Sequence, residues 1–94
     1  YIEAAAKALG GIDVLVNNSS GFGSSDDEAG WAVGLNVDVM AMVRASHAAL
    51  PWLEKAGAAH DVHGGKAGAS IINMSSISGL RPAGRQPPYG AVKA

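Results

Sequence analysis

The 94-residue sequence predicts an α/β fold built on a parallel sheet. Two short apolar runs, residues 12–17 and 69–74, have almost no polar alternation, which is typical of parallel strands covered on both faces. Between them, residues 31–55 carry apolar side chains at helical spacing. A strand, a crossover helix and a second strand form a right-handed unit, so we expect parallel strands whose carboxyl ends share one edge of the sheet.

Composition and charge exclude several classes of protein. Hydrophobic residues make up 48% of the chain and charged residues 16%, which is too apolar for a disordered segment. No apolar run reaches the roughly 18 residues of a membrane span, and a formal net charge of −1 without a basic stripe argues against a nucleic-acid partner. The absence of cysteine excludes a thiolate nucleophile. Since residues 1–9 do not resemble a signal peptide, we expect a cytoplasmic protein.

Local signals place the elements around the first strand. Residues 1–9 are rich in good helix formers and are followed by Gly10, so they predict a helix with a glycine stop. Residues 18–30 are dense in Gly, Ser and Asp and predict a loop. Pro51 lies inside the long helix, where it removes a backbone donor, and predicts a bend or a helix end.

Local sequence signals also place the loops and the final helix around the second strand. Residues 56–68 are mostly small and predict a loop, and residues 75–86 predict a polar loop after the second strand. Pro88 favours the first turn of a final helix. Ligands of open α/β sheets bind beyond the carboxyl ends of the strands, so residues 17–25 and 75–86 are expected to line one crevice.

Tyr89 and Lys93 are four residues apart in the predicted final helix, which places both side chains on one face. A nearby ammonium favours phenolate and draws the pKa of a tyrosine from about 10 toward neutral pH, where it can transfer protons. Taken alone, the same spacing also fits two side chains on a solvent-exposed helix. Ser76 lies thirteen residues before Tyr89, where its hydroxyl could orient a carbonyl; Ser75 and Ser78 are alternatives that only the spacing disfavours.

Together with Ser76, Tyr89 and Lys93, further motifs make the sequence resemble the short-chain dehydrogenase/reductase family over essentially its whole length. The resemblance rests on five stretches, which are GGIDVLVNN (10–18), LNV (35–37), ALPWL (49–53), SIINMSSISGLRP (70–82) and PYGAVKA (88–94). It implies a partial Rossmann-like doubly wound parallel sheet with helices on both faces. Residues 1–94 would be part of a single domain, from its fourth strand to the start of its catalytic helix. The upstream glycine-rich cofactor turn and the downstream substrate region are absent from the sequence.

The resemblance also implies roles for individual residues. Tyr89 would be the general acid/base, and Lys93 would tune it and donate to the nicotinamide ribose. Ser76 would polarise the substrate oxygen, and Asn36 would hold a water that relays protons to Lys93. Asn17 would lie against the cofactor. From propensity alone, Asn17 could instead cap the strand end, and Asn36 could cap a helix bend.

The implied reaction is hydride transfer between NAD or NADP and a small alcohol or carbonyl compound. The alternatives are a sensor or scaffold that binds dinucleotide without turnover, and an independent structural module. The resemblance also implies a homodimer or homotetramer, and the long helix has a second apolar face that could serve it: Met40, Met42, Val43, Ala45, Ala48 and Ala49.

Three features depart from the family pattern. Ser19 and Ser20 stand where the family has Ala-Gly, and the interval from Asn17 to Asn36 is short. The segment with His60 and His63 has no family counterpart. A His-x-x-His pair could bind a metal, but the surrounding glycines and the lack of carboxylates favour a solvated loop.

Overall fold

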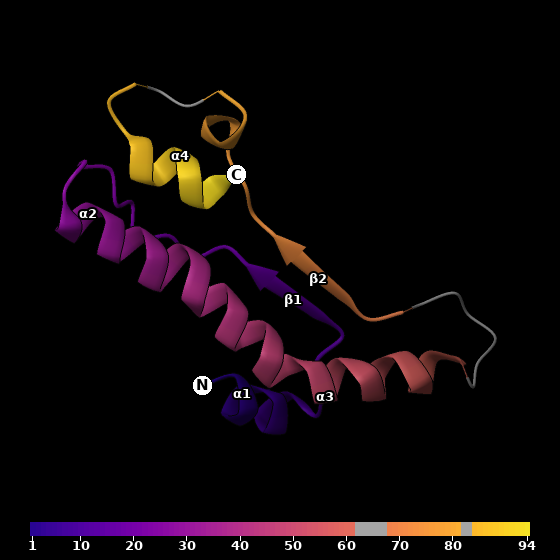
Figure 1. The fold of residues 1–94 in the computed structure, drawn as a ribbon. Coiled ribbons are helices and arrows are strands. Elements are labelled where there is room, and N and C mark those ends of the chain that lie inside the picture. Colours follow the sequence, from indigo (N-terminus) through magenta and orange to yellow (C-terminus); the bar gives the residue numbers. More distant parts are fainter. Residues whose placement is uncertain (62–67, 82–83) are drawn as a thin grey trace. The chain divides into compact units, whose positions relative to one another are not determined.

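The structure is a computed structural model that describes residues 1–61, 68–81 and 84–94 (Figure 1). Its elements follow in this order: α1 (Ile2–Leu9), β1 (Val14–Asn17), α2 (Glu28–Val33), the π-helix η1 (Gly34–Met40), α3 (Ala41–Asp61), β2 (Ser70–Asn73), the 3₁₀-helix η2 (Ile77–Gly79) and α4 (Pro87–Lys93). The predicted order of helix, strand, long helix, strand and helix is confirmed.

The two strands form one sheet. β1 and β2 are neighbours, and Figure 1 shows their arrows pointing the same way. The Ser70 N–H donates to the Asp13 carbonyl at 3.0 Å, just before β1 begins. Both strands are shorter than the apolar runs that predicted them, and the predicted α/β fold with parallel strands is confirmed.

Helix α1 ends as predicted. Gly10 adopts φ 84°, the left-handed conformation that glycine takes without steric cost, and its N–H donates to the Ala6 carbonyl. The Gly11 N–H donates to the same carbonyl at 2.9 Å. This cap stops the helix and turns the chain toward β1.

The long helix begins earlier than predicted, so the expected loop over residues 18–30 is wrong for its last three residues. Asp27 is in an extended conformation, and its side chain accepts a hydrogen bond from the Gly30 N–H at 2.7 Å. Glu28 adds a negative charge in the first turn, where the helix dipole favours it. The cap therefore starts the helix at Glu28 rather than at Trp31.

The helix also continues further than predicted. Pro51 lies inside α3, which runs to Asp61, so the loop expected over residues 56–68 is wrong for residues 56–61. A proline removes only one backbone donor, and the alanine-rich sequence that follows favours helix. Figure 1 shows α3 changing direction along its length, in line with the expected bend. His63 lies outside the described residues. The prediction that His60 and His63 belong to a solvated loop rather than to a metal site therefore also concerns residues outside the described part.

The chain divides into two compact units. The first comprises Tyr1–Asn17 and Arg44–Ile72, and the second comprises Asn18–Val43 and Asn73–Ala94. The core of the first unit consists of Leu15, Ala49 and Leu53, with partly buried Ile2, Ile12, Ala45 and Ala69 packed around it. In the second unit, α4 packs on η1 and η2. No helix among the described residues has both the length and the apolarity to cross a bilayer.

Candidate functional site

Four of the five predicted site residues belong to the second unit. Ser76 lies at the start of η2, Asn36 lies in η1, and Tyr89 and Lys93 lie in α4. Helix α4 packs against both η1 and η2, so the three elements that carry these residues are in contact. Asn17 belongs to the first unit.

Helix α4 holds Tyr89 and Lys93. Pro88 in its first turn is fully buried, and the Gly90 N–H donates to the Gln86 carbonyl at 3.1 Å. The predicted final helix is therefore confirmed, and Tyr89 and Lys93 share one of its faces. Tyr89 is half-buried, whereas Lys93 is buried with 8% of its side chain exposed.

Among the described residues, the Lys93 ammonium has two partners. Its Nζ lies 3.2 Å from the Asp38 Oδ1 and donates to the Met74 carbonyl at 3.4 Å. The Asp38 side chain is fully buried, so the ion pair is shielded from solvent. A buried lysine needs such a partner because desolvation of an unpaired charge is costly.

Asp38 is a functional candidate that sequence reasoning missed. Its Oδ2 accepts a hydrogen bond from the Gly21 N–H at 3.1 Å. Burial raises the pKa of Asp38, but hydrogen bonds from Ser20 and Gly21 and the Lys93 ammonium outweigh it, so this pKa lies below its usual value. The available signal was that Asp38 is the one charged residue in LNVDVM, residues 35–40.

Asn36 is exposed in the structure, two positions from the buried Asp38. Its carbonyl accepts a hydrogen bond from the Ala41 N–H, which is the i to i+5 pattern of a π-helix. The helical interior was unfavourable for Asn36 on propensity, and the irregular turn explains how the chain accommodates it. In η1, Asp38 is the residue that pairs with Lys93.

The three serines have different partners. The Ser76 Oγ accepts a hydrogen bond from the Ser78 N–H at 3.2 Å and so caps η2. That bond uses a lone pair of the hydroxyl and leaves its proton without an acceptor among the described residues. The Ser75 Oγ donates to the Lys93 carbonyl and so joins the loop to the end of α4.

Phe22 is a second residue that the sequence did not indicate. Its ring stacks on the Tyr89 ring, with centroids 6.1 Å apart and planes 12° from parallel. The backbone of Phe22 has φ 51°, which is uncommon for a residue with a side chain. Through Phe22 and Ser75, both loops predicted to line the site contact α4.

Glycines allow the close packing around Lys93. A Cβ at Gly79 would collide with the Lys93 carbonyl, and one at Gly34 would lie 3.2 Å from the Val92 side chain. Both contacts are backbone approaches of η2 and η1 to α4. Small residues at these two positions therefore hold the end of α4 against its neighbours.

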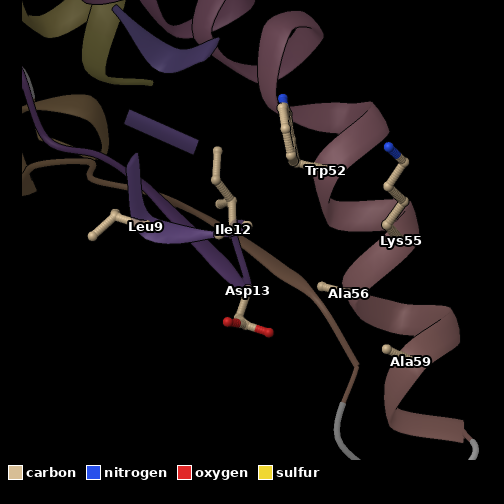
Figure 2. Close-up of a pocket in the computed structure, with 9 residues that line it drawn as sticks. Leu9, Ile12, Asp13, Trp52, Lys55, Ala56 and Ala59 are labelled. Atoms are coloured by element: carbon tan, nitrogen blue, oxygen red, sulfur yellow. The ribbon is translucent and has the colours of Figure 1, made fainter. Parts of the chain in front are cut away.

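The first unit contains Asn17 and a separate hollow. The Asn17 side-chain amide donates to the Ser46 Oγ at 3.2 Å, which ties the end of β1 to α3. A cavity of about 340 Å³ lies beside the start of β1, and Figure 2 shows residues that line it, Trp52 and Lys55 among them. The Lys55 ammonium lies 5.2 Å from the centroid of the Trp52 ring. The cavity contains no predicted site residue. No group of three or more possible metal ligands occurs in the part of the chain that the structure describes.

Comparison with known proteins gives a consistent result. A sequence model of the short chain dehydrogenases matches residues 1–94. Human 15-hydroxyprostaglandin dehydrogenase [NAD(+)] is 33% identical over 85 residues, which is 90% of this chain and 28% of that protein. Isoepoxydon dehydrogenase patN of Penicillium expansum is 36% identical over 96 residues, which is 100% of this chain and 33% of that protein. The chain thus spans about a third of the length of these relatives.

Solved structures show the same fold. The NADH-dependent reductase A1-R′, described as responsible for alginate metabolism, superposes with a TM-score of 0.79 at 23% identity, covering 98% of this chain and 38% of that one. Its complex with NAD gives a TM-score of 0.77 at 24% identity, covering 98% and 39%. The predicted partial Rossmann-like architecture is therefore confirmed.

Proposed function

Because the chain belongs to the short-chain dehydrogenase family, we propose that it forms the proton-transfer site of an NAD-dependent oxidoreductase acting on an alcohol or carbonyl compound. The observation that carries this proposal is the pairing of Tyr89 and Lys93 on one face of α4, with Lys93 buried in an ion pair. A surface pair at the same spacing would leave the lysine in solvent. Burial of the lysine favours the catalytic role over that alternative.

In the proposed reaction, Tyr89 gives a proton to the carbonyl oxygen of the substrate during reduction and takes it back during oxidation. Ser76 donates its free hydroxyl proton to the same oxygen and orients it. Lys93, one helical turn from Tyr89 on the same face of α4, assists this proton transfer. Asn36 holds a water that connects Lys93 with solvent, a role that fits its exposed position.

The residues of the site fit a nicotinamide dinucleotide. An ammonium has three protons, and Asp38 and Met74 engage two of those on Lys93, which leaves one for a ribose hydroxyl. Asn17 at the end of β1 is the other proposed contact. NAD is favoured over NADP because one relative is named for NAD(+) and one structural neighbour binds NAD. When bound, the nicotinamide would supply or accept the hydride.

Residues 1–94 are proposed to be one part of a single dinucleotide-binding domain. We also propose that the full-length protein is a homodimer or homotetramer that uses the apolar face of the long helix. These proposals follow the family resemblance and the apolar residues of that face.

The test uses the full-length protein with NAD, NADH and a panel of alcohols and ketones, monitored by nicotinamide absorbance. Substrate-dependent oxidation or reduction is expected. The sensor or scaffold alternative predicts saturable NAD binding by calorimetry with no turnover of any compound. Failure to bind NAD or NADP at all would contradict both.

A further inference from the structure

We propose that Asp38 is a positioning residue for the proposed reaction, holding the Lys93 ammonium in place and setting the net charge beside Tyr89. The inference rests on the proposed function, since it concerns how that site works. Asp38 would not contact the substrate; it would act on the reaction by holding Lys93.

Asp38 and Lys93 form a buried ion pair rather than a pair of charges on the surface. The Asp38 side chain is fully buried, and that of Lys93 is 8% exposed. Oδ1 lies 3.2 Å from the ammonium in an ion pair and has no hydrogen-bond partner among the described residues, while Oδ2 accepts from the Gly21 N–H. The two carboxylate oxygens of Asp38 thus have different partners: Oδ1 faces Lys93 of α4, and Oδ2 accepts from Gly21 in the loop after β1.

These two contacts join Asp38 to the loop that carries Phe22 and to the helix that carries Tyr89. Gly21 precedes Phe22, whose ring stacks on Tyr89, and Lys93 lies on the same face of α4 as Tyr89. One carboxylate in η1 therefore contacts both the loop that carries Phe22 and the cation on the face of α4 that carries Tyr89. The Ser20 hydroxyl also acts on Asp38, and Ser20, Gly21 and Lys93 all favour its ionised form and lower its pKa.

The charge balance follows from the neighbours of α4. Asp38 is the only charged residue of η1, and η2 carries none; on α4 itself the titratable groups are Tyr89 and Lys93, with Arg85 just before the helix. The Asp38 and Lys93 charges are opposite and adjacent, so together they act on Tyr89 as a nearly neutral pair. Removal of the carboxylate charge would leave an uncompensated cation there, which favours phenolate.

The experiment compares Asp38→Asn and Asp38→Ala in the full-length protein. Asparagine keeps the shape and can still accept from the ammonium, so it isolates the charge. We expect the inflection in the pH profile of kcat/KM to move to lower pH by about one unit. Alanine also removes the anchor, so we expect the Kd for NADH to rise roughly tenfold. Glu28→Gln, which removes the same charge from an exposed residue of α2, should leave both unchanged.

The outcomes separate the two proposals. An inactive wild-type protein would refute the proposed function itself. An active wild type whose Asp38→Asn variant has the same pH profile, and whose Asp38→Ala variant has the same Kd, would refute the role of Asp38.

A measurement on the wild type covers the case in which neither Asp38 variant folds. A buried, paired ammonium exchanges its protons slowly. We therefore expect a Lys93 ammonium resonance in heteronuclear NMR at neutral pH that is absent from Lys93→Met. Its absence from the wild type would overturn the proposal.

Discussion

The ion pair of Asp38 and Lys93 is both a part of the candidate site and a contribution to stability. A buried carboxylate that accepts from Ser20 and Gly21 and faces an ammonium is held in its charged form. Removal of either charge would leave the other one buried and uncompensated. At the scale of single residues, this pair links the fold to the proposed chemistry.

The pair predicts a loss of stability in acid. The pKa of Asp38 is below its ordinary value of 3.8 in the folded state, so the unfolded chain binds more protons at low pH. The contribution of Asp38 is therefore complete above about pH 4 and is lost as the pH falls through the lower folded value. Urea unfolding of the full-length protein at a series of pH values should show this slope, and Asp38→Asn should flatten it. An equal slope in that variant would contradict the assignment.

Spacing made part of this site predictable from sequence. Tyr89 and Lys93 are local to one helix, so their common face could be anticipated from the sequence, whereas Ser76 was selected by its spacing to Tyr89 and stays a prediction. Asp38 could not be found in the same way. Its partner is 55 positions away in a helix whose contact with η1 only the three-dimensional structure gives.

Asp27 decides where the long helix begins, which is a property of the whole element. Its side chain satisfies the Gly30 N–H, one of the donors that a helix start leaves without a partner. Asp27→Ala should lower the free energy of unfolding by about 1 kcal/mol, whereas Asp27→Asn should restore most of it because asparagine also caps well. Denaturant titration measures both variants. Equal losses for alanine and asparagine would show that charge, not capping, is the cause.

The contact between η2 and α4 depends on the lack of a side chain at Gly79. A Cβ there would meet the Lys93 carbonyl, so Gly79→Ala should displace the end of α4. We expect a loss of stability of roughly 1–3 kcal/mol together with reduced activity. Gly84→Ala is the matched control, since its Cβ would have no neighbour within 4 Å. If both variants behave like the wild type, the close approach at Gly79 is not required.

Some helix boundaries could be predicted from local sequence signals, and others could not. Gly10 as a helix stop and the Pro87-Pro88 helix start are local features, and both were predictable. The π-helix was not, because the apolar spacing of residues 34–40 also fits an α-helix, and the difference lies in which carbonyl the Ala41 N–H reaches. The end of α3 was not predictable either, because the small residues after Lys55 fit a loop as well as a helix, and the helix continues to Asp61.

At the scale of the whole molecule, the sheet of the first unit has apolar residues with little cover. Val14 and Val16 of β1 are about half exposed, at 51% and 50%, and Ile71 and Ile72 of β2 are 40% and 47% exposed. Among the described residues of this unit, the buried apolar cluster consists of Leu15, Ala49 and Leu53. In an α/β fold such strands are covered on both faces.

The isolated 94-residue chain is therefore expected to be unfolded, molten or aggregated. Apolar burial stabilises by about 25 cal/mol per Å², whereas ordering costs roughly 1.5 kcal/mol per residue, so we expect so small a core to be insufficient. Calorimetry should show no cooperative thermal transition, and NADH should not bind saturably. A sharp transition would instead support the reading of the chain as an independent module.

The most direct test of the central claim is the kinetics of Tyr89→Phe in the full-length protein. If Tyr89 transfers the proton, kcat should fall by about 10²- to 10⁴-fold while the Kd for NADH stays within about twofold of the wild type, because phenylalanine keeps the ring. Lys93→Ala should reduce kcat and weaken NADH binding together. Near-normal turnover in Tyr89→Phe would contradict the account.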